Sequence, residues 1–102
     1  MTLKQKVLKL ISKIPRGKVA SYGFIATLAR KVNGAREVGW ILFSISPDSN
    51  IPWWRVINSK GLISIKNSMI SKKFQKEMLE KENIYVDNKF MVDLKKYHWK
   101  YK

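Results

Sequence analysis

The chain has 102 residues, enough for one domain with its own core and too few for a second. It holds 21 basic and 7 acidic residues, a formal net charge of +14, with no cysteine and a single histidine, His98. Disulfides, thiolate nucleophiles and cysteine-based metal sites are therefore excluded, and a histidine-centred triad or metal centre is not expected. A hydrophobic fraction of 45% excludes a disordered chain.

The excess of positive charge indicates a polyanionic partner, because repulsion between like charges would otherwise only destabilise the fold. Nucleic acid is the first candidate and an anionic membrane surface is the second. Glu37 and Asp48 are the only acidic residues before residue 60, so we expect the first half to face the polyanion. No apolar stretch approaches the roughly 18 residues of a membrane span, and the lysine-rich start does not fit a signal peptide. A soluble, intracellular chain is expected.

Apolar residues recur with a helical period three times in the first half of the chain. The predicted helices cover residues 3–14, 22–31 and 35–44, with Thr2 and Ser21 as N-cap residues, Pro15 as a stop and Asn33-Gly34 as a turn. In the second half we expect short strands at 55–57 and 62–65 around a turn at 58–61, followed by a helix over 71–81. A second hairpin of 85–86 and 90–92 around Asp87-Asn88 and an aromatic strand at 97–101 would complete the chain.

Two short helices joined by a tight turn and followed by a small hairpin are typical of a winged helix-turn-helix. The helix over 35–44 would then be the recognition helix. A pair of core helices with no role in nucleic-acid binding is the alternative, and the charge of +14 favours DNA.

Four ordered blocks are the most informative part of the sequence. They are IPRGKVASYG at 14–23, AREVG at 35–39, IPWWRVINS at 51–59 and GLIS at 61–64. Their order and spacing resemble the DNA-binding domain of the O6-alkylguanine-DNA alkyltransferases over residues 2–101. The resemblance implies a single domain over 1–102, mainly α with small β-hairpins, and a winged helix-turn-helix like the C-terminal domain of those enzymes.

The enzymes carry a Pro-Cys-His-Arg-Val signature in which the cysteine accepts the alkyl group. Here Trp53 takes the cysteine position, as in the alkyltransferase-like proteins, which are non-catalytic relatives of the enzymes. Trp54 takes the histidine position, and Glu82 matches the glutamate that this histidine reaches through water. Alkyl transfer needs a thiolate, so this chain is expected not to be an enzyme and to use no cofactor or metal. The relatives typically keep the histidine, so Trp54 is a departure.

The resemblance implies a pocket that holds a flipped base. Trp53 would be its wall, whereas a core tryptophan beneath the hairpin is the alternative. Trp54 lies either in the core or near the pocket. Lys66 occupies the place where several relatives carry an arginine that senses the adduct, although an ordinary exposed lysine fits as well. Tyr22 would line the pocket and crowd the phosphate 3′ of the target, or would cap the core with its hydroxyl outward.

The residues expected on DNA are Tyr22, Arg36, Gly39 and Trp40. The resemblance implies that Arg36 enters the duplex and fills the gap left by the flipped nucleotide. A solvated arginine that pairs with Glu37 or with a phosphate is the alternative. Gly39 would let the helix lie against the minor groove, and Trp40 would either pack inward or broaden the contact. A further set has phosphate or structural roles that the sequence does not separate: Arg16, Lys18, Arg30, Lys31 and Arg55. His98 is expected at the surface, with no function assigned.

We therefore expect a protein that recognises O6-alkylguanine in duplex DNA, flips the lesion and leaves it unrepaired. The expected partners are double-stranded DNA with O6-alkylguanine and nucleotide excision repair proteins, with no membrane. A monomer is expected in the cytoplasm at the nucleoid, or in the nucleus if the source is eukaryotic. The alternative is a winged-helix regulator or nucleoid-type protein that never flips a base. Preference for alkylated over plain guanine at equal salt separates the two.

Overall fold

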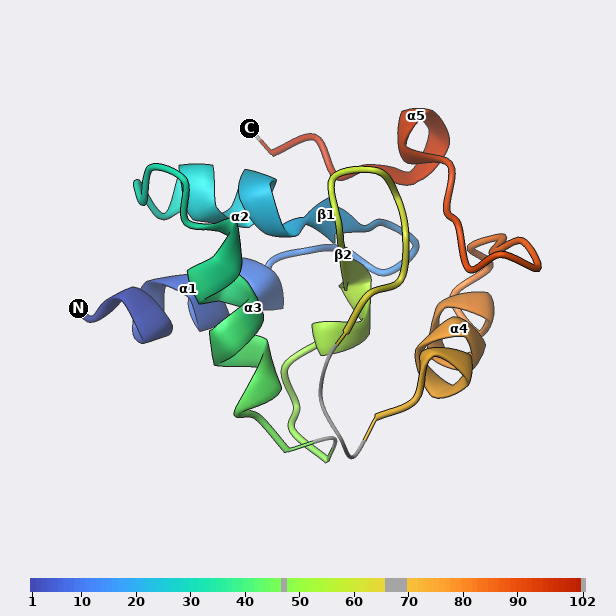
Figure 1. The fold of residues 1–102 in the computed structure, drawn as a ribbon, viewed down its shortest axis with the longest axis horizontal. Coiled ribbons are helices and arrows are strands. Elements are labelled where there is room, and N and C mark those ends of the chain that lie inside the picture. The colour runs from blue at the N-terminus through green and yellow to red at the C-terminus, as the bar shows by residue number, and fades with distance from the viewer. Residues whose placement is uncertain (47, 66–69, 102) are drawn as a thin grey trace.

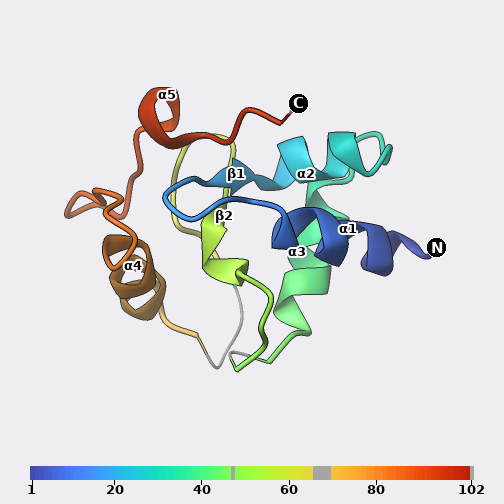
Figure 2. The same ribbon diagram turned by 180° about the vertical axis from the view of Figure 1, so that it is seen from behind.

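The computed structural model describes residues 1–46, 48–65 and 70–101. Three helices gather at one end of the molecule, α4 and α5 lie toward the other, and two short strands run between them (Figures 1 and 2). The elements are α1 (Leu3–Ser12), β1 (Ala20–Ser21), α2 (Tyr22–Leu28), α3 (Ala35–Phe43), the 3-10 turn η1 (Trp53–Arg55), β2 (Val56–Ile57), α4 (Lys72–Glu80) and α5 (Leu94–Tyr97). Among the described residues, no helix is long and apolar enough to cross a membrane.

The first helix begins where the sequence predicted. Thr2 is the N-cap, and its hydroxyl accepts the Gln5 backbone N–H at 3.1 Å while the Gln5 side chain accepts the Thr2 N–H at 2.9 Å. This reciprocal pair satisfies two of the helix's unpaired donors. The helix ends at Ser12, two residues before the predicted end, although Ile14 stays buried in the core.

The turn between α2 and α3 orients the third helix. The second helix ends at Leu28, not at the predicted residue 31, because Arg30 adopts a left-handed conformation with φ of 62° and the Lys31 N–H donates to the Ala26 carbonyl at 2.9 Å. At Gly34 a Cβ atom would lie 2.4 Å from the Lys31 side chain, so only glycine fits there. The third helix then has nearly its predicted bounds.

The strand pairing differs from the prediction. The turn at 58–61 forms, with Gly61 at φ of 88° and the Asn58 side chain accepting the backbone N–H of Leu62. However, β2 pairs in parallel with β1, not with 62–65. A parallel pair needs a long crossover, and α2 and α3 provide it here. Leu62 instead forms an antiparallel bridge with Met91.

The C-terminal segments also differ from the prediction. The fourth helix starts after Ser71, whose hydroxyl caps it by accepting the Phe74 N–H at 3.0 Å. The predicted hairpin of 85–86 and 90–92 is a turn, closed by the Asp87 carboxylate on the backbone N–H of Met91. Neither segment is a strand in this described part of the chain.

The tail is not the predicted strand over 97–101, because α5 ends at Tyr97 and the tail forms only an isolated parallel bridge between His98 and Val19 among the described residues. Val19 donates to the Tyr97 carbonyl at 2.9 Å and accepts from Trp99 at 2.7 Å. The prediction that His98 is a plain surface residue is wrong. Its Nε2 accepts the Ser21 backbone N–H at 3.2 Å, so it holds the residue that caps α2.

The buried apolar side chains form two clusters. One lies among α1, α2 and α3 and includes Trp53, and the other joins the inner residues of 57–63 to α4 and the C-terminal segments. Trp54 packs against both clusters. The short segment 53–57 therefore connects the two halves of the core.

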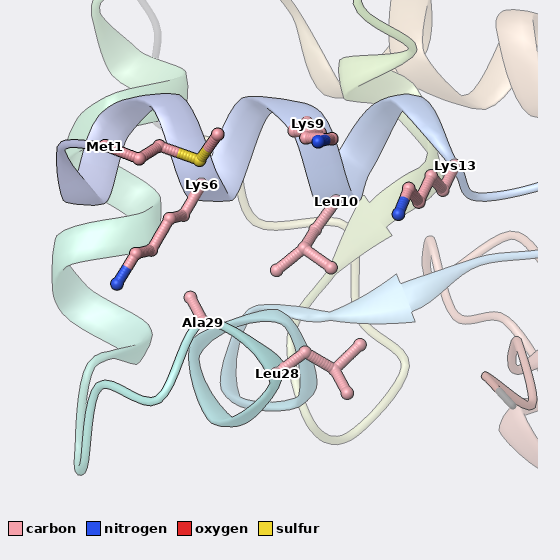
Figure 3. Close-up of a pocket in the computed structure, with 7 residues that line it drawn as sticks. All are labelled: Met1, Lys6, Lys9, Leu10, Lys13, Leu28 and Ala29. Atoms are coloured by element: carbon pink, nitrogen blue, oxygen red, sulfur yellow. The ribbon is translucent and has the colours of Figure 1, made fainter.

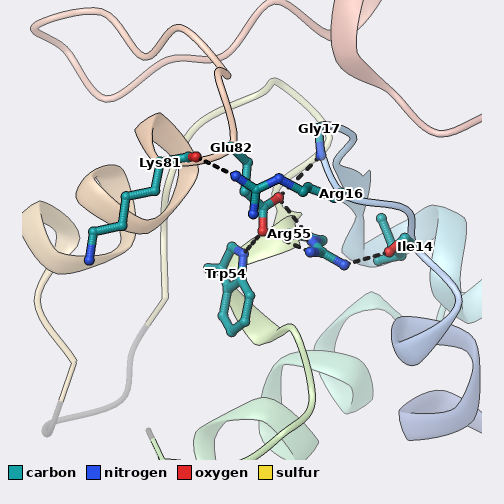
Figure 4. A network of polar contacts seen from close by, with 7 residues as sticks. All are labelled: Ile14, Arg16, Gly17, Trp54, Arg55, Lys81 and Glu82. Carbon is teal, nitrogen blue, oxygen red and sulfur yellow. Dashed lines mark hydrogen bonds and ion pairs between the residues drawn. The ribbon is translucent and has the colours of Figure 1, made fainter.

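A buried carboxylate fastens this connecting segment. Glu82 accepts the Trp54 indole N–H at 2.7 Å, the Gly17 backbone N–H at 3.2 Å, and the Arg55 guanidinium through Nε at 2.9 Å and Nη2 at 2.7 Å (Figure 4). Arg55 also donates to the Ile14 carbonyl at 2.7 Å. The side chains of Arg55 and Glu82 are 14% and 4% exposed. We call this group the Glu82 clamp.

The clamp determines the charge state of its carboxylate. Burial by itself would raise the pKa of Glu82, but hydrogen bonds from Arg55, Trp54 and Gly17, with the positive charge of Arg55, lower that pKa below its ordinary value of 4.5. Glu82 is therefore ionised at neutral pH, and its oxygens are occupied by donors.

Replacing Glu82 with Gln should destabilise the fold, because the substitution leaves the Arg55 charge buried without its partner. Removing one member of a buried pair costs about 3–5 kcal/mol. Urea unfolding at neutral pH measures the loss. Glu80→Gln is the matched control, since Glu80 is exposed at the end of α4 and should change the free energy by less than about 0.5 kcal/mol. Equal losses in both variants would contradict the clamp.

The lowered pKa of Glu82 also predicts a dependence on acid. A carboxylate with a depressed folded-state pKa stabilises the fold above its unfolded-state pKa, and this contribution is lost as the pH falls through the folded-state value. The free energy of unfolding should therefore fall more steeply below about pH 4.5 in the parent than in Glu82→Gln. Unfolding titrations across that range check the difference, and parallel curves would argue against it.

Candidate nucleic-acid interface

The presumed recognition helix presents Arg36 on its outer side. Arg36 is the second residue of α3 and is exposed, and in the described part of the chain it forms no ion pair with Glu37. The pairing considered as an alternative is therefore not observed. The exposed residues Arg30 and Lys31 lie in the turn that leads into the same helix. Three exposed cations thus lie within seven residues at this corner of the molecule.

The outer face of α3 continues with Gly39 and Trp40. A Cβ atom at Gly39 would meet nothing within 4 Å, so packing inside the protein does not require glycine there. Trp40 is 63% exposed and does not pack inward. The inner face, with Val38 and Leu42, is buried. The face predicted to meet DNA is therefore the exposed one.

Tyr22 begins α2 directly after its cap residue Ser21. Its ring is half-buried against the first core cluster. Burial raises the pKa of the Tyr22 hydroxyl, and a hydrogen bond with the Ser64 side chain offsets part of that rise. The phenol is thus neutral at physiological pH, and its hydroxyl is attached to the segment after the 58–61 turn. The alternative prediction was a Tyr22 that caps the core with its hydroxyl outward. The hydrogen bond to Ser64 is a contact that this alternative did not include.

Trp53 lies in η1 and has no exposed surface. Its ring meets Trp54 edge-on at 5.6 Å between centroids and Phe74 at 5.8 Å. In this conformation Trp53 is a core residue, as in the alternative considered for it. Its role as a pocket wall stays a prediction. Lys66, the other predicted pocket residue, lies outside the described residues.

Trp54 is half-buried, and it forms hydrogen bonds in addition to its apolar packing. Its indole N–H donates to Glu82, and its backbone carbonyl accepts from the Gln75 side-chain amide at 3.0 Å. An indole N–H is only a donor, so it cannot pass a proton in two directions as an imidazole can. The position that resembles the enzymes' proton relay is therefore a fixed structural hydrogen bond here.

Gln75 in α4 is 0% exposed, although the sequence did not predict it as a buried residue. Its Nε2 donates to the backbone carbonyls of Trp54 and Val56, both at 3.0 Å, and its Oε1 has no partner among the described residues. One amide thus binds both the 3-10 turn that contains Trp53 and the first residue of β2. A glutamine in an amphipathic helix reads as a surface residue, so no sequence signal identifies it.

The structure also distinguishes the roles of the basic residues whose phosphate or structural functions the sequence did not separate. Arg55 is structural, because it belongs to the Glu82 clamp. Arg16 donates to the Lys81 carbonyl at 2.7 Å, beside the same clamp. Lys18 is exposed, and its amine lies 3.5 Å from the Lys96 carbonyl. Arg30 and Lys31 are the members of this set that remain beside α3.

A shallow pocket of about 200 Å³ lies between α1 and α2, where Ala29, the residue before Arg30, is part of its lining (Figure 3). Lys6, Lys9 and Lys13 surround a floor that includes Leu10 and Leu28. None of the predicted site residues lines it. It adds to the positive surface but is not the expected base pocket.

Comparison with known proteins identifies the family. Residues 2–84 match the family described as 6-O-methylguanine DNA methyltransferase, DNA binding domain. A DNA base-flipping protein of Vibrio parahaemolyticus is 42% identical over 94 residues, which are 92% of each chain. Alkyltransferase-like protein 1 of Schizosaccharomyces pombe is 35% identical over 99 residues, 93% of this chain and 92% of that protein.

Solved structures agree with the sequence comparison. The fold superimposes with a TM-score of 0.87 on S. pombe Atl1 in complex with damaged DNA containing O6-carboxymethylguanine, at 35% identity, over 96% of this chain and 94% of that chain. Mycobacterium tuberculosis OGT in complex with DNA matches with a TM-score of 0.69 at 30% identity, over 81% of this chain and 49% of that chain. The predicted fold class is confirmed, and the chain belongs to the family of the 6-O-methylguanine DNA methyltransferase DNA-binding domain.

Proposed function

We propose that this protein binds O6-alkylguanine in duplex DNA and flips the damaged nucleotide without removing its alkyl group. The observation that carries the proposal is Trp53 at the acceptor position of a chain that has no cysteine. Alkyl transfer to the protein requires a thiolate, and the neighbouring Trp54 and Glu82 form a fixed hydrogen bond. The features that remain are those for binding DNA.

The likeness to relatives supports the DNA partner. Atl1 is solved with damaged DNA, and relatives in Vibrio parahaemolyticus and Escherichia coli are named DNA base-flipping proteins. In this chain, Arg36, Arg30 and Lys31 supply exposed charge beside α3 for the phosphates. Gly39 is a residue that weakens a helix by about 1 kcal/mol relative to alanine. Its open surroundings fit a close approach of the DNA backbone.

In the proposed complex Arg36 fills the gap that the flipped nucleotide leaves. A guanidinium is planar and permanently charged, so it stacks between bases and donates to the orphaned partner. Flipping costs a few kcal/mol, which the stacking and the pocket contacts offset. Tyr22 stands at the start of α2, where its neutral phenol packs against the backbone of the target nucleotide.

The proposed base pocket must open when DNA binds. Trp53 is fully buried, and Phe74, which is 39% exposed, lies against its ring. Displacement of Phe74 gives a base access to the indole face. A lesion held in this way is not repaired by this protein, so we propose that the stable complex marks the site for nucleotide excision repair proteins.

Binding to matched duplexes tests the function. We expect tighter binding to a duplex with one O6-methylguanine than to the same duplex with guanine at equal salt, measured by fluorescence anisotropy. Mass spectrometry after incubation should find the protein mass unchanged and the lesion intact. Equal affinities would favour a regulator that never flips a base, and a gain of one methyl group by the protein would end the non-catalytic proposal.

Substitutions at Arg36 test the flipping step. Stacking is worth about 1–3 kcal/mol per base, so Arg36→Ala should weaken the lesion complex about 5- to 150-fold and weaken the plain complex less. Arg36→Lys keeps the charge but not the planar group, so it should also flip poorly, as reported by a fluorescent base analogue at the target. Lys31→Ala is the control for loss of one exposed charge, and it should weaken binding to the lesion duplex and to the plain duplex equally. If Arg36→Lys behaves like the parent, Arg36 contacts only a phosphate.

A further inference from the structure

Trp40 and Phe43 form an aromatic pair on the outer face of α3. They are distinct from the residues proposed to fill the gap in the duplex and to hold the flipped base. Trp40 is 63% exposed and Phe43 is 45% exposed. Their rings meet edge-on, with centroids 5.9 Å apart and planes at 69°. Phe43 therefore supports one side of the indole, and the two rings together form a raised apolar surface on a helix only nine residues long.

This pair shares a face with Arg36. Residues four and seven positions along a helix lie on the same side as the first, so Arg36, Trp40 and Phe43 form one stripe, with the side-chain-free Gly39 beside it. Four residues advance about 6 Å along the helix axis. Successive bases on one strand are about 3.4 Å apart, so a helix lying along a groove places Trp40 about two base steps from Arg36.

The surroundings of the pair favour nucleic acid as its occupant over a protein. The stripe includes the exposed cation Arg36, and the exposed cations Arg30 and Lys31 lie in the turn that leads into the same helix. A partner that covers this face must satisfy dense positive charge and aromatic surface together. Duplex DNA does so, because proteins that bind the minor groove combine cations with apolar wedges that unstack a base step.

We propose that Trp40, supported by Phe43, is a second wedge that enters the minor groove and unstacks a base step about two positions from the flipped nucleotide. The inference rests on the proposed function for the placement of α3 on DNA. The wedge opens the groove around the helix and makes the strand easier to distort. It is an apolar contact, so it adds affinity that does not depend on salt.

The test compares Trp40→Ala, Trp40→Phe and the control Val32→Ala, which removes an 85% exposed apolar side chain from the turn before α3. Each variant is titrated against the lesion duplex and the plain duplex over a range of salt. Trp40→Ala should weaken binding to both about 5- to 150-fold, Trp40→Phe should weaken it less, and Val32→Ala should match the parent. The slope of log affinity against log salt should not change, whereas a lost phosphate contact would lower it by about one.

The position of the wedge is read by 2-aminopurine placed in turn at the base pairs flanking the lesion. The parent should raise its fluorescence about two steps away, and Trp40→Ala should abolish that rise. Trp40→Ala should also unfold at the parent's temperature, because the side chain is exposed. Unchanged affinity, a lower salt slope, or no local change in fluorescence would each overturn the wedge. Absence of any preference of the parent for the lesion would instead contradict the proposed function, whatever the result for Trp40.

Discussion

Glu82 is the point at which three segments distant in the sequence meet, and the position of the candidate site depends on it. Its carboxylate receives the guanidinium of Arg55, the indole N–H of Trp54 and the backbone of Gly17. A buried charge is tolerated only when it is paired and hydrogen-bonded, so these donors have little freedom to move apart. The turn that carries Trp53 is consequently held in one place between the two clusters of the core.

The same clamp gives a structural role to the residues at the positions of the enzymes' histidine and glutamate. In the enzymes that the sequence resembles, a histidine and a glutamate prepare a cysteine for alkyl transfer. Here the indole of Trp54 donates directly to Glu82, and a donor-only group cannot accept the proton that a relay must pass on. In this chain Glu82 has a structural role instead, because its carboxylate forms a buried ion pair with Arg55.

The arginine and lysine side chains differ in whether they bind within the protein or stay exposed. Arg55 and Arg16 are committed to internal hydrogen bonds near the clamp, whereas Arg36, Arg30 and Lys31 stay exposed around α3. The left-handed turn at Arg30 and the tight approach at Gly34 decide where that helix begins. Local backbone geometry thus brings the free cations and the aromatic pair Trp40 and Phe43 to one face.

The sequence by itself determined the family, the helical class and most helix starts, because these depend on local signals: the cap residues Thr2 and Ser21, helical periodicity, and ordered motifs around Trp53. It also determined that Trp53 stands where the enzymes carry the cysteine that accepts the alkyl group, in a chain without cysteine. The parallel pairing of β1 with β2, the buried roles of Gln75 and His98, and the burial of Trp53 were decided only by the tertiary structure. Each depends on contacts between residues about 20 to 80 positions apart, and neither propensity nor periodicity carries information about such pairs.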